Sequence, residues 1–457
     1  MNVLAGRART PGYIQGEDAL VTLRTLKTSN FIVKALSIIS FGNKMRGALL
    51  LLFCSFLTFG AAFAGNSSRY VEPLTVYLTW QHSPESTMTV NWITPLGVEE
   101  DLEYRPNGGK WNQTKASHKQ LPNDVPYLLH RVELTGLQPA TAYEFLIGNK
   151  GVPYKFRTMP ESLEKPIRYV VGGDMYHDEM EILHATNRQA AQQDPLFVLV
   201  GGDIAYASSN MFDFFPRWGH PWVDRIVGQK FDRWLEWLVA WKEDMVTPQG
   251  YLIPMLPAIG NHDVAGRFGQ TPEQAPFFYS LFPMPGLPGY NVLDFGQYMS
   301  IFLLDSGHTN SVEGTQANWL ASQLWQRRHV PHKFALYHVP AYPSVHKMTE
   351  TIGAQIRKYW VPSFDAYHLT AAFENHEHAY KRTHPLLNGQ IDARGVVYIG
   401  DGGWGVEKPR KPRRVDEKWF LAKAESVRQF LVVDVEKDKQ TVKAISSDGK
   451  EIDSFSW

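Results

Sequence analysis

The stretch VLVGGDIAY at residues 198–206 shows the arrangement that decides the fold. An apolar run, typical of a buried strand, ends at two glycines, and Asp203 and Tyr206 follow shortly after them. Beyond residue 165, runs of this kind alternate with segments of helical spacing. Such alternation is typical of an α/β sheet, and we therefore predict an α/β domain over residues 165–457.

The strands and helices of this domain are predicted from seven apolar runs and three periodic segments. The runs are IRYVV, LFVLV, MLPAI, YMSIFLL, FALY, LTAAF and GVVYI. The segments of helical spacing are EILHATNRQAAQQ, FDRWLEWLVAWKEDM and TQANWLASQLWQRR. The second segment carries an apolar stripe that predicts a face turned to the core, made by Phe231, Trp234, Leu235, Leu238 and Trp241.

Residues 68–160 follow a different pattern, with short strands and no long helical segment. The stretch STMTVNWITP alternates, which places Met88, Val90 and Trp92 on one face of a strand. The stretch LQPATAY at 137–143 resembles the tyrosine corner of a fibronectin type III domain. We therefore predict a small all-β sandwich, followed by the polar, proline-containing linker MPESLEKP.

Polar side chains follow five of the predicted strands in the α/β region. They are Asp174; Asp203 and Tyr206; Asn261, His262 and Asp263; His338; and His376 with His378. Each residue alone is weak evidence, since an Asp after a strand commonly forms a turn. Ligands of open α/β sheets bind at the carboxyl ends of the strands, so these residues are expected to converge. An extended chain would also point His376 and His378 to the same side, because residues two apart share a face.

This set of motifs resembles a known family. The order Gly-Asp, Gly-Asp-x-x-Tyr, Gly-Asn-His-Asp, His and His-x-His is similar to that of the calcineurin-like metallophosphoesterases. Tyr206 and the preceding sandwich resemble the purple acid phosphatases. The resemblance implies an α/β sandwich of two mixed sheets flanked by helices. It also implies a pair of metal ions, Fe(III) and a divalent Zn, Mn or Fe ion.

The resemblance assigns a role to each residue of the set. Its implied ligands are Asp174, Tyr206 and His378 for Fe(III), Asn261, His338 and His376 for the divalent ion, and Asp203 as the bridge between the two. Carboxylate and phenolate donors suit Fe(III), whereas imidazole and amide donors suit a divalent ion. The implied function is an acid phosphatase that hydrolyses phosphomonoesters by attack of a metal-bound hydroxide.

Two further histidines are the implied catalytic residues. His262 stands at the family's position for phosphate contact and proton donation, and His346 is the second candidate. A histidine in a surface loop is the alternative interpretation of His346. The chain also departs from the family pattern, because Tyr176 and Asn375 stand where glycine is usual. Neither position is a ligand, so these departures concern substrate range more than metal binding.

Other functions remain open at this point. A phosphodiesterase acting on nucleotides or lipid head groups would use the same ligands. A secreted binding protein without activity is disfavoured, because every ligand position is filled. Lys and Arg total 46 and equal Asp and Glu, so no overall charge favours nucleic acid as a partner. The densest basic stretch, EKPRKPRRVDEK at 407–418, is interpreted as a solvated loop rather than a phosphate-steering flap.

Residues 45–64 predict a secretory signal. A short basic start precedes an apolar run and the sequence Ala-Phe-Ala before Gly65, and the run is short for a transmembrane anchor. Residues 1–44 are then an upstream extension. The single cysteine, Cys54, lies inside the signal, so the mature chain has no disulfide. We expect a secreted or periplasmic protein with no stable membrane anchor, whose partner is a phosphate ester.

Overall fold

The structure is a computed structural model that describes residues 72–208 and 228–457. The predicted signal at 45–64 and the extension at 1–44 lie outside the described residues. In the described ranges, the model contains no helix with the length and apolar character needed to span a bilayer.

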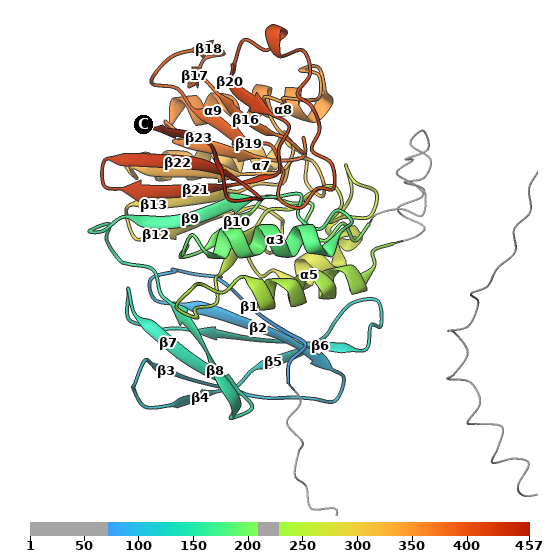
Figure 1. Cartoon of the computed structure of the whole chain (residues 1–457), viewed down its shortest axis with the longest axis vertical. Coiled ribbons are helices and arrows are strands. Elements are labelled where there is room, and N and C mark those ends of the chain that lie inside the picture. Colours follow the sequence, from blue (N-terminus) through green and yellow to red (C-terminus); the bar gives the residue numbers. More distant parts are fainter. Residues whose placement is uncertain (1–71, 209–227) are drawn as a thin grey trace, which may run out of the picture. The chain divides into compact units, whose positions relative to one another are not determined.

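The N-terminal part is a β-sandwich of two antiparallel four-stranded sheets, with the orders β1-β2-β6-β5 and β4-β3-β7-β8 (Figure 1). Its strands are β1 (Thr75–Thr79), β2 (Met88–Pro95), β3 (Leu102–Pro106), β4 (Asn112–Thr114), β5 (Ser117–Gln120), β6 (Tyr127–Leu134), β7 (Ala142–Ile147) and β8 (Lys150–Arg157). Met88, Val90 and Trp92 lie in one buried core, as their alternation predicts. The Tyr143 hydroxyl accepts a hydrogen bond from the Gln138 backbone N–H at 2.9 Å, which confirms the tyrosine corner.

Two larger mixed sheets form the α/β part, and they confirm the predicted fold class. The first has the order β11-β10-β9-β21-β22-β23 and the second β12-β13-β14-β15-β19-β16-β20. The strands of the first are β9 (Ile167–Gly172), β10 (Val198–Val200), β11 (Met255–Pro257), β21 (Gln429–Glu436), β22 (Lys439–Ser446) and β23 (Glu451–Ser456). Those of the second are β12 (Asn291–Phe295), β13 (Met299–Leu303), β14 (His332–Leu336), β15 (Ala371–Glu374), β16 (Tyr380–Thr383), β19 (Val397–Gly400) and β20 (Leu421–Glu425). All seven apolar runs are strands, and a small hairpin adds β17 (Leu386–Leu387) and β18 (Gln390–Ile391).

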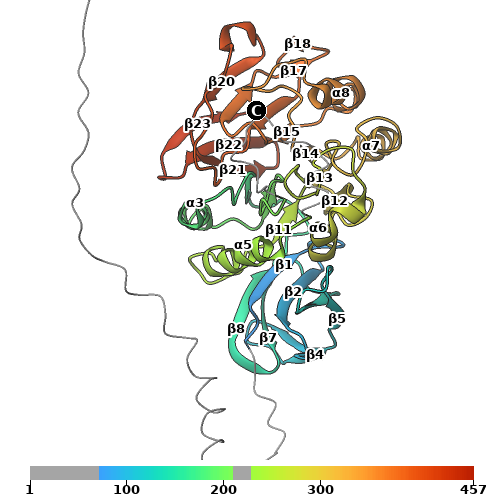
Figure 2. The same cartoon turned by 90° about the vertical axis from the view of Figure 1, so that its right-hand side faces the viewer.

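Helices cover the outer faces of both sheets. The three predicted helices are α3 (Met180–Ala191), α5 (Phe231–Asp244) and α7 (Thr315–Gln326). Shorter helices with weaker sequence patterns are α6 (Pro276–Leu281), α8 (Thr351–Tyr359) and α9 (Val361–Ala366), together with the 3₁₀ turns η1 (Pro272–Gln274) and η2 (Val415–Glu417). Figure 2 shows α3 and α5 on one side of the sheets and α7 and α8 on the other. On α5, Trp237 is buried in addition to the predicted stripe, whereas Leu235 is half-buried.

Alternation along each strand separates the inner core from the outer ones. In the first sheet, Val171 and Leu199 face the second sheet, while Val170 and Val198 pack with α3 and α5. In the second sheet, Ala335 packs with α7, α8 and α9. Both faces of each sheet are therefore buried, which explains why the strands read as continuous apolar runs.

The sandwich shares its core with the α/β part. Trp80 packs edge-on against Phe197, which precedes β10, and against Phe295 of β12, at centroid distances of 5.9 and 6.0 Å. The Thr75 hydroxyl donates to the Leu238 carbonyl of α5 at 2.7 Å. Residues 159–166, predicted as a linker, begin with the fully buried Met159. The sandwich is thus fixed to the α/β part by packing as well as by chain connection.

Candidate metal centre

The predicted site residues come together where the parallel strands of both sheets end. In the first sheet, β9, β10 and β11 run parallel, and in the second β13, β14, β15 and β19 do so. Asp174, Asp203 and Asn261 follow the strands of the first sheet. His338 and the pair His376 and His378 follow β14 and β15. The carboxyl edges of two sheets therefore supply one site.

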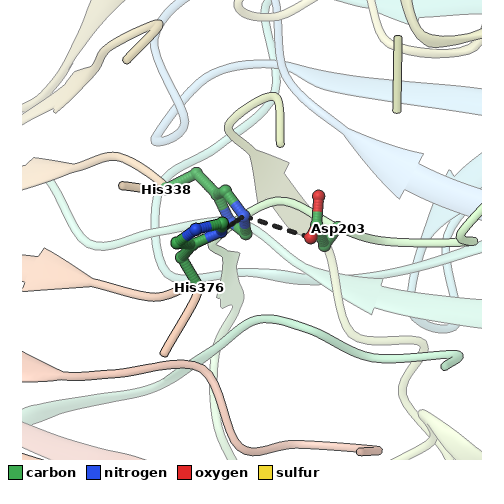
Figure 3. Close-up of side chains that lie close together, drawn as sticks. All are labelled: Asp203, His338 and His376. Atoms are coloured by element: carbon green, nitrogen blue, oxygen red, sulfur yellow. Dashed lines mark hydrogen bonds and ion pairs between the residues drawn. The ribbon is translucent and has the colours of Figure 1, made fainter. Parts of the chain in front are cut away.

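One group of donor atoms gathers around His338. Its Nε2 lies 3.2 Å from the Asp203 Oδ2, 3.1 Å from the Asn261 Oδ1 and 3.1 Å from the His376 Nδ1. Figure 3 shows Asp203, His338 and His376 turned toward one another. The ligand atoms of these three residues all lie within 4.8 Å of one another.

A second group consists of Asp174, Tyr206 and His378. The Tyr206 hydroxyl lies 3.2 Å from the Asp174 Oδ1 and 3.0 Å from the His378 Nε2, and that nitrogen is 3.0 Å from the same carboxylate oxygen. Donors held about 2 Å from one ion at right angles are about 3 Å apart, so the triangle has the size of a metal face. The groups adjoin each other, because the His376 backbone N–H donates to the Asp174 Oδ2 at 2.9 Å.

The backbone at the site is left-handed at five of the seven predicted ligands. Their φ angles are positive, between 49° and 75°, at Asp174, Asp203, Tyr206, His376 and His378. The prediction that His376 and His378 share a side through an extended chain is therefore wrong. β15 ends at Glu374, and the left-handed turns send His376 to the His338 group and His378 to the Asp174 group. Such conformations cost free energy and are commonly retained where function requires them.

Two glycines that the motif analysis left without a role allow this close packing. A Cβ on Gly260 would lie 2.1 Å from the Asp203 backbone nitrogen, and one on Gly402 would lie 1.8 Å from the Asp174 Oδ2. Any larger residue at either position would displace a predicted ligand. Gly260 belongs to the Gly-Asn-His-Asp motif, whereas Gly402 follows β19 and no motif pointed to it.

The pKa shifts of His338 in the first group and Tyr206 in the second both favour a bound cation. Burial lowers the pKa of His338, but the carboxylates of Asp203 and Asp174 raise it more, to about 9. The His338 Nδ1 lies 2.9 Å from the Gly201 carbonyl, which fixes the ring and directs Nε2 to the other donors. Burial also raises the pKa of Tyr206 well above its ordinary value, and the charges of Asp174 and Asp203 add to this. A bound cation would relieve both effects, because it favours a neutral imidazole and a phenolate.

His262 lies over the Tyr206 ring, with the ring centroids 4.6 Å apart. Its backbone N–H donates to the Asp203 Oδ1 at 2.7 Å, and this hydrogen bond fixes the backbone of His262 beside a predicted ligand. Burial lowers its pKa to about 3. Its buried Nδ1 has no hydrogen-bond partner among the residues that the structure describes. A buried polar atom without a partner calls for an explanation, and a hydrogen bond to a bound ligand would provide one.

His346 lies on the other side of the site, in the loop after β14. Its ring stacks on that of His376, with centroids 5.5 Å apart and planes at 23°. Its Nδ1 is hydrogen-bonded to the buried Glu377 Oε1, and its backbone N–H donates to the Glu377 Oε2 at 2.7 Å. The hydrogen bonds to Glu377 therefore fix the His346 ring beside the predicted ligand His376.

Glu377 is the residue of the site whose role the motifs did not indicate. It lies between two predicted ligands and is fully buried, yet its carboxylate points away from them to Val345 and His346. Behind it, the Lys381 ammonium contacts Glu374 at 2.5 Å and Asp401 at 3.1 Å, both fully buried. The position of Glu377 between two predicted ligands was the one sign in the sequence that it has a role. Its partner, His346, could not be identified without the fold.

The two departures from the family pattern point away from the donor atoms. The Tyr176 hydroxyl donates to the Glu236 Oε2 at 2.9 Å, and its ring lies against the Arg233 guanidinium. The Asn375 Nδ2 donates to the Tyr337 carbonyl at 3.0 Å. A Cβ on Gly201 would lie 2.0 Å from that same nitrogen, so Asn375 fills the space behind the loop. Neither side chain occupies the space between the predicted ligands.

Comparisons with known proteins agree with this architecture. Residues 73–158 match the family model of the purple acid phosphatase N-terminal domain, and residues 167–380 match that of the calcineurin-like phosphoesterases. Purple acid phosphatase 23 of Arabidopsis thaliana is 24% identical over 75% of this chain and 81% of the relative. Mouse acid phosphatase type 7 is 24% identical over 79% of this chain and 86% of the relative.

Solved structures show the same fold. A purple acid phosphatase from yellow lupin seeds superposes with a TM-score of 0.65 and 17% identity, covering 84% of this chain and 74% of the lupin chain. PhoD superposes with a TM-score of 0.60 and 12% identity, covering 86% of this chain and 94% of the other. Since the two family models match in order, the chain belongs to the purple acid phosphatases of the calcineurin-like superfamily, a family of metal-dependent phosphoesterases.

Proposed function

We propose that this protein is a secreted acid phosphatase that uses two metal ions to hydrolyse phosphomonoesters. The observation that carries the proposal is the approach of seven donor residues, from five strand ends, to within about hydrogen-bond distance of one another in two adjoining groups. Structural ion pairs alone would not require an amide, a phenol and three imidazoles at one sheet edge.

The proposed ligands fall into a hard and a softer set. Asp174, Tyr206 and His378 would hold Fe(III), since carboxylate and phenolate oxygens are hard anionic donors. A divalent Zn, Mn or Fe ion would be held by Asn261, His338 and His376, with Asp203 as the bridge. When bound, such a pair supplies Lewis-acid activation of a water and of the phosphoryl oxygens.

The two histidines have distinct proposed roles. His262 is held neutral by burial, so its ring N–H can donate a hydrogen bond to a phosphoryl oxygen. In His346, Nδ1 donates to Glu377, which orients Nε2 toward the space beside His376. Proton transfer from His346 to the oxygen of the leaving alcohol is the step that completes hydrolysis.

Metal analysis and the visible spectrum test the ligand assignment. We expect two metal ions per purified chain, one of them iron, and a pink to violet colour from charge transfer between the Tyr206 phenolate and Fe(III). Replacing Tyr206 with Phe should bleach the colour while much of the activity remains. Less than one ion per chain, or an active iron-containing enzyme without colour, would contradict the assignment.

The choice between monoester and diester hydrolysis needs a matched pair of substrates. Comparing kcat/KM for 4-nitrophenyl phosphate with that for bis(4-nitrophenyl) phosphate keeps the leaving group constant. The proposal expects the monoester to be preferred, and preference for the diester would replace the phosphatase by a phosphodiesterase. Secretion is tested separately by N-terminal sequencing of exported protein, which should begin at Gly65.

A further inference from the structure

The basic stretch at 407–414 lies between β19 and β20 and carries a strong local charge. Five cationic side chains and one carboxylate, that of Glu407, give this loop a formal charge of +4. The five cations are all exposed, as predicted for a solvated loop, and are Lys408, Arg410, Lys411, Arg413 and Arg414. Two prolines restrict the backbone between them.

The backbone of this loop is attached to the metal centre. The Arg410 backbone N–H donates to the His378 carbonyl at 2.7 Å, and its guanidinium donates to the His376 carbonyl at 3.1 Å. Farther along, the Arg413 N–H donates to the Ser344 carbonyl at 3.0 Å, two residues before His346. The exposed cations are therefore held beside the predicted ligands and do not belong to a loop that is free of the site.

Two hollows that share wall residues lie between the predicted ligand His376 and these cations. A hollow of about 390 Å³ has His376, Glu377 and His346 in its wall, next to apolar side chains that include Phe268 and Ile352. A second hollow of about 660 Å³ shares His346 with the first. A substrate whose phosphorus lies at the metal donors can therefore extend past His346 into the second hollow.

Four of the ten residues that line the second hollow are cationic. It is bordered by Lys347, Arg413, Arg414 and Lys418, against the two carboxylates of Glu350 and Glu417. Lys418 is engaged, since its ammonium donates to the Ser344 and His346 carbonyls at 2.5 and 3.0 Å. Arg414 lies 3.6 Å from the Glu417 carboxylate, whereas Lys347 and Arg413 have no ion pair within the described ranges. The hollow thus offers cationic groups that are available to an anion.

We propose that this loop and hollow form a second anion-binding site, which selects substrates whose terminal phosphate is joined to further phosphate groups by a phosphoanhydride bond. Inorganic polyphosphate and nucleoside di- and triphosphates have this chemistry. This proposal rests on the proposed phosphatase function. In the reaction, the water oxygen forms a bond to the terminal phosphorus while the bond to the bridging oxygen breaks. The shortened phosphate leaves with that electron pair and accepts the proton.

A triple variant, K408A/K411A/R413A, tests the proposal without altering any residue of the proposed metal centre. It removes three charges, whereas the backbone hydrogen bonds of residues 410 and 413 and the Arg410 side chain remain. The matched control is K165A/K437A/K439A, which removes the same charge from exposed lysines. These lysines lie at the opposite edge of the first sheet, because Val435 near the end of β21 pairs with Ile167 at the start of β9.

The readout is kcat/KM for phenyl phosphate, ADP and ATP, measured at low and at physiological salt. We expect K408A/K411A/R413A to lower kcat/KM for ATP by about tenfold and for ADP by less, with phenyl phosphate within about twofold of wild type. Added salt should lower the wild-type rate with ATP more than that of the variant. The control variant should match wild type with all three substrates.

Three results would overturn the proposal: equal losses for ATP and phenyl phosphate, no loss for ATP, or the same loss in the control variant. A wild-type enzyme that hydrolyses no phosphate ester would instead contradict the proposed function. Wild-type hydrolysis of phenyl phosphate together with unchanged ATP kinetics in the variant would leave the phosphatase function intact and remove only the second site.

Discussion

The β-sandwich and the metal-centre edge use strained backbone in opposite ways. In the sandwich, the non-glycine residues with positive φ are turn formers, Asn123, Asp124 and Asn149, apart from Ala140. At the metal centre, the same conformation is taken by two aspartates, a tyrosine and two histidines that the proposed chemistry requires. Asn, Asp and His are the non-glycine residues found most often in left-handed backbone, whereas Tyr adopts it rarely.

This difference shows which demand determines the residue type in each region, the local backbone conformation or the proposed chemistry. The Asn and Asp turn residues of the sandwich favour the backbone conformation that they adopt, so local preference and overall fold agree at these positions. The predicted ligands would suit a bound ion and substrate, and the surrounding packing must hold their left-handed backbone in place. Substitutions at the proposed metal centre should therefore reduce activity far more than substitutions in the sandwich, which should lower stability and leave the activity of each folded molecule unchanged.

The largest expected effect is that of Asp203→Asn on activity. The substitution preserves size but removes the charge that reaches both donor groups, so kcat should fall at least about a thousandfold. The free energy of unfolding of the metal-free protein should fall as well, because the buried His338 ring loses the carboxylate that raises its pKa. Kinetics with an aryl phosphate measures kcat, elemental analysis measures the metal content, and denaturant unfolding measures the free energy of unfolding. Wild-type activity in this variant would remove Asp203 from the site.

The reverse pattern is expected for Trp80→Ala in the sandwich. Loss of this fully buried ring should lower the free energy of unfolding by about 3–5 kcal/mol, while kcat per folded molecule stays unchanged. Because Trp80 packs against Phe197 and Phe295, the whole described chain should unfold at a lower denaturant concentration. The control is Trp325→Ala on α7, a ring that is 53% exposed and should matter little. Separate unfolding of the sandwich alone would contradict a shared core.

The same contrast explains how much could be predicted from the sequence. Apolar runs and alternation depend on neighbouring residues, so all seven runs, the tyrosine corner and the fold class could be predicted. The contact between Trp80 and Phe295 joins residues more than two hundred positions apart, and no local pattern encodes it. The joint position of the sandwich and the α/β part was therefore missed.

At the proposed metal centre, the convergence of the candidate residues could be predicted from the sequence, but their backbone geometry could not. The convergence of His376 and His378 followed from the motif, yet the pleated-strand argument for it failed because both residues are left-handed. The role of Glu377 depends on a loop more than thirty residues away, which supplies His346. Tertiary contacts decide both features.

An intermediate effect on acid stability is expected from His130, which is buried in the sandwich. Its ring stacks on Trp92, and its Nε2 lies 2.7 Å from the Thr94 hydroxyl. Burial lowers its pKa to about 4, and the nearby His118 adds to this. Because the folded pKa lies below the unfolded value near 6.5, stability is full above that pH and is lost as the pH falls toward 4.

The loss attributable to His130 should reach up to about 3 kcal/mol at the acid end. Denaturant unfolding of wild type and His130→Gln at several pH values between 7 and 4 measures it as the difference between the two curves. The variant should be less stable than wild type at pH 7 but should lose less on acidification. Parallel curves would show that His130 takes up no proton on unfolding.

The smallest of these effects, and the sharpest test of the metal-centre side, is Glu377→Gln. The amide can accept only through one atom, so its NH₂ group would face either the His346 ring nitrogen or the backbone N–H groups that the carboxylate now satisfies. Misorientation of His346 should lower kcat for an aryl phosphate by about 10- to 100-fold, with metal content and KM nearly unchanged. Glu350→Gln is the matched control, because it alters a carboxylate of the same hollow whose charge acts on His346 but which, unlike Glu377, is not its hydrogen-bond partner in the described chain. A loss of metal in Glu377→Gln would show instead that Glu377 supports His376 and His378, and equal kinetics in both variants would remove His346 from proton transfer.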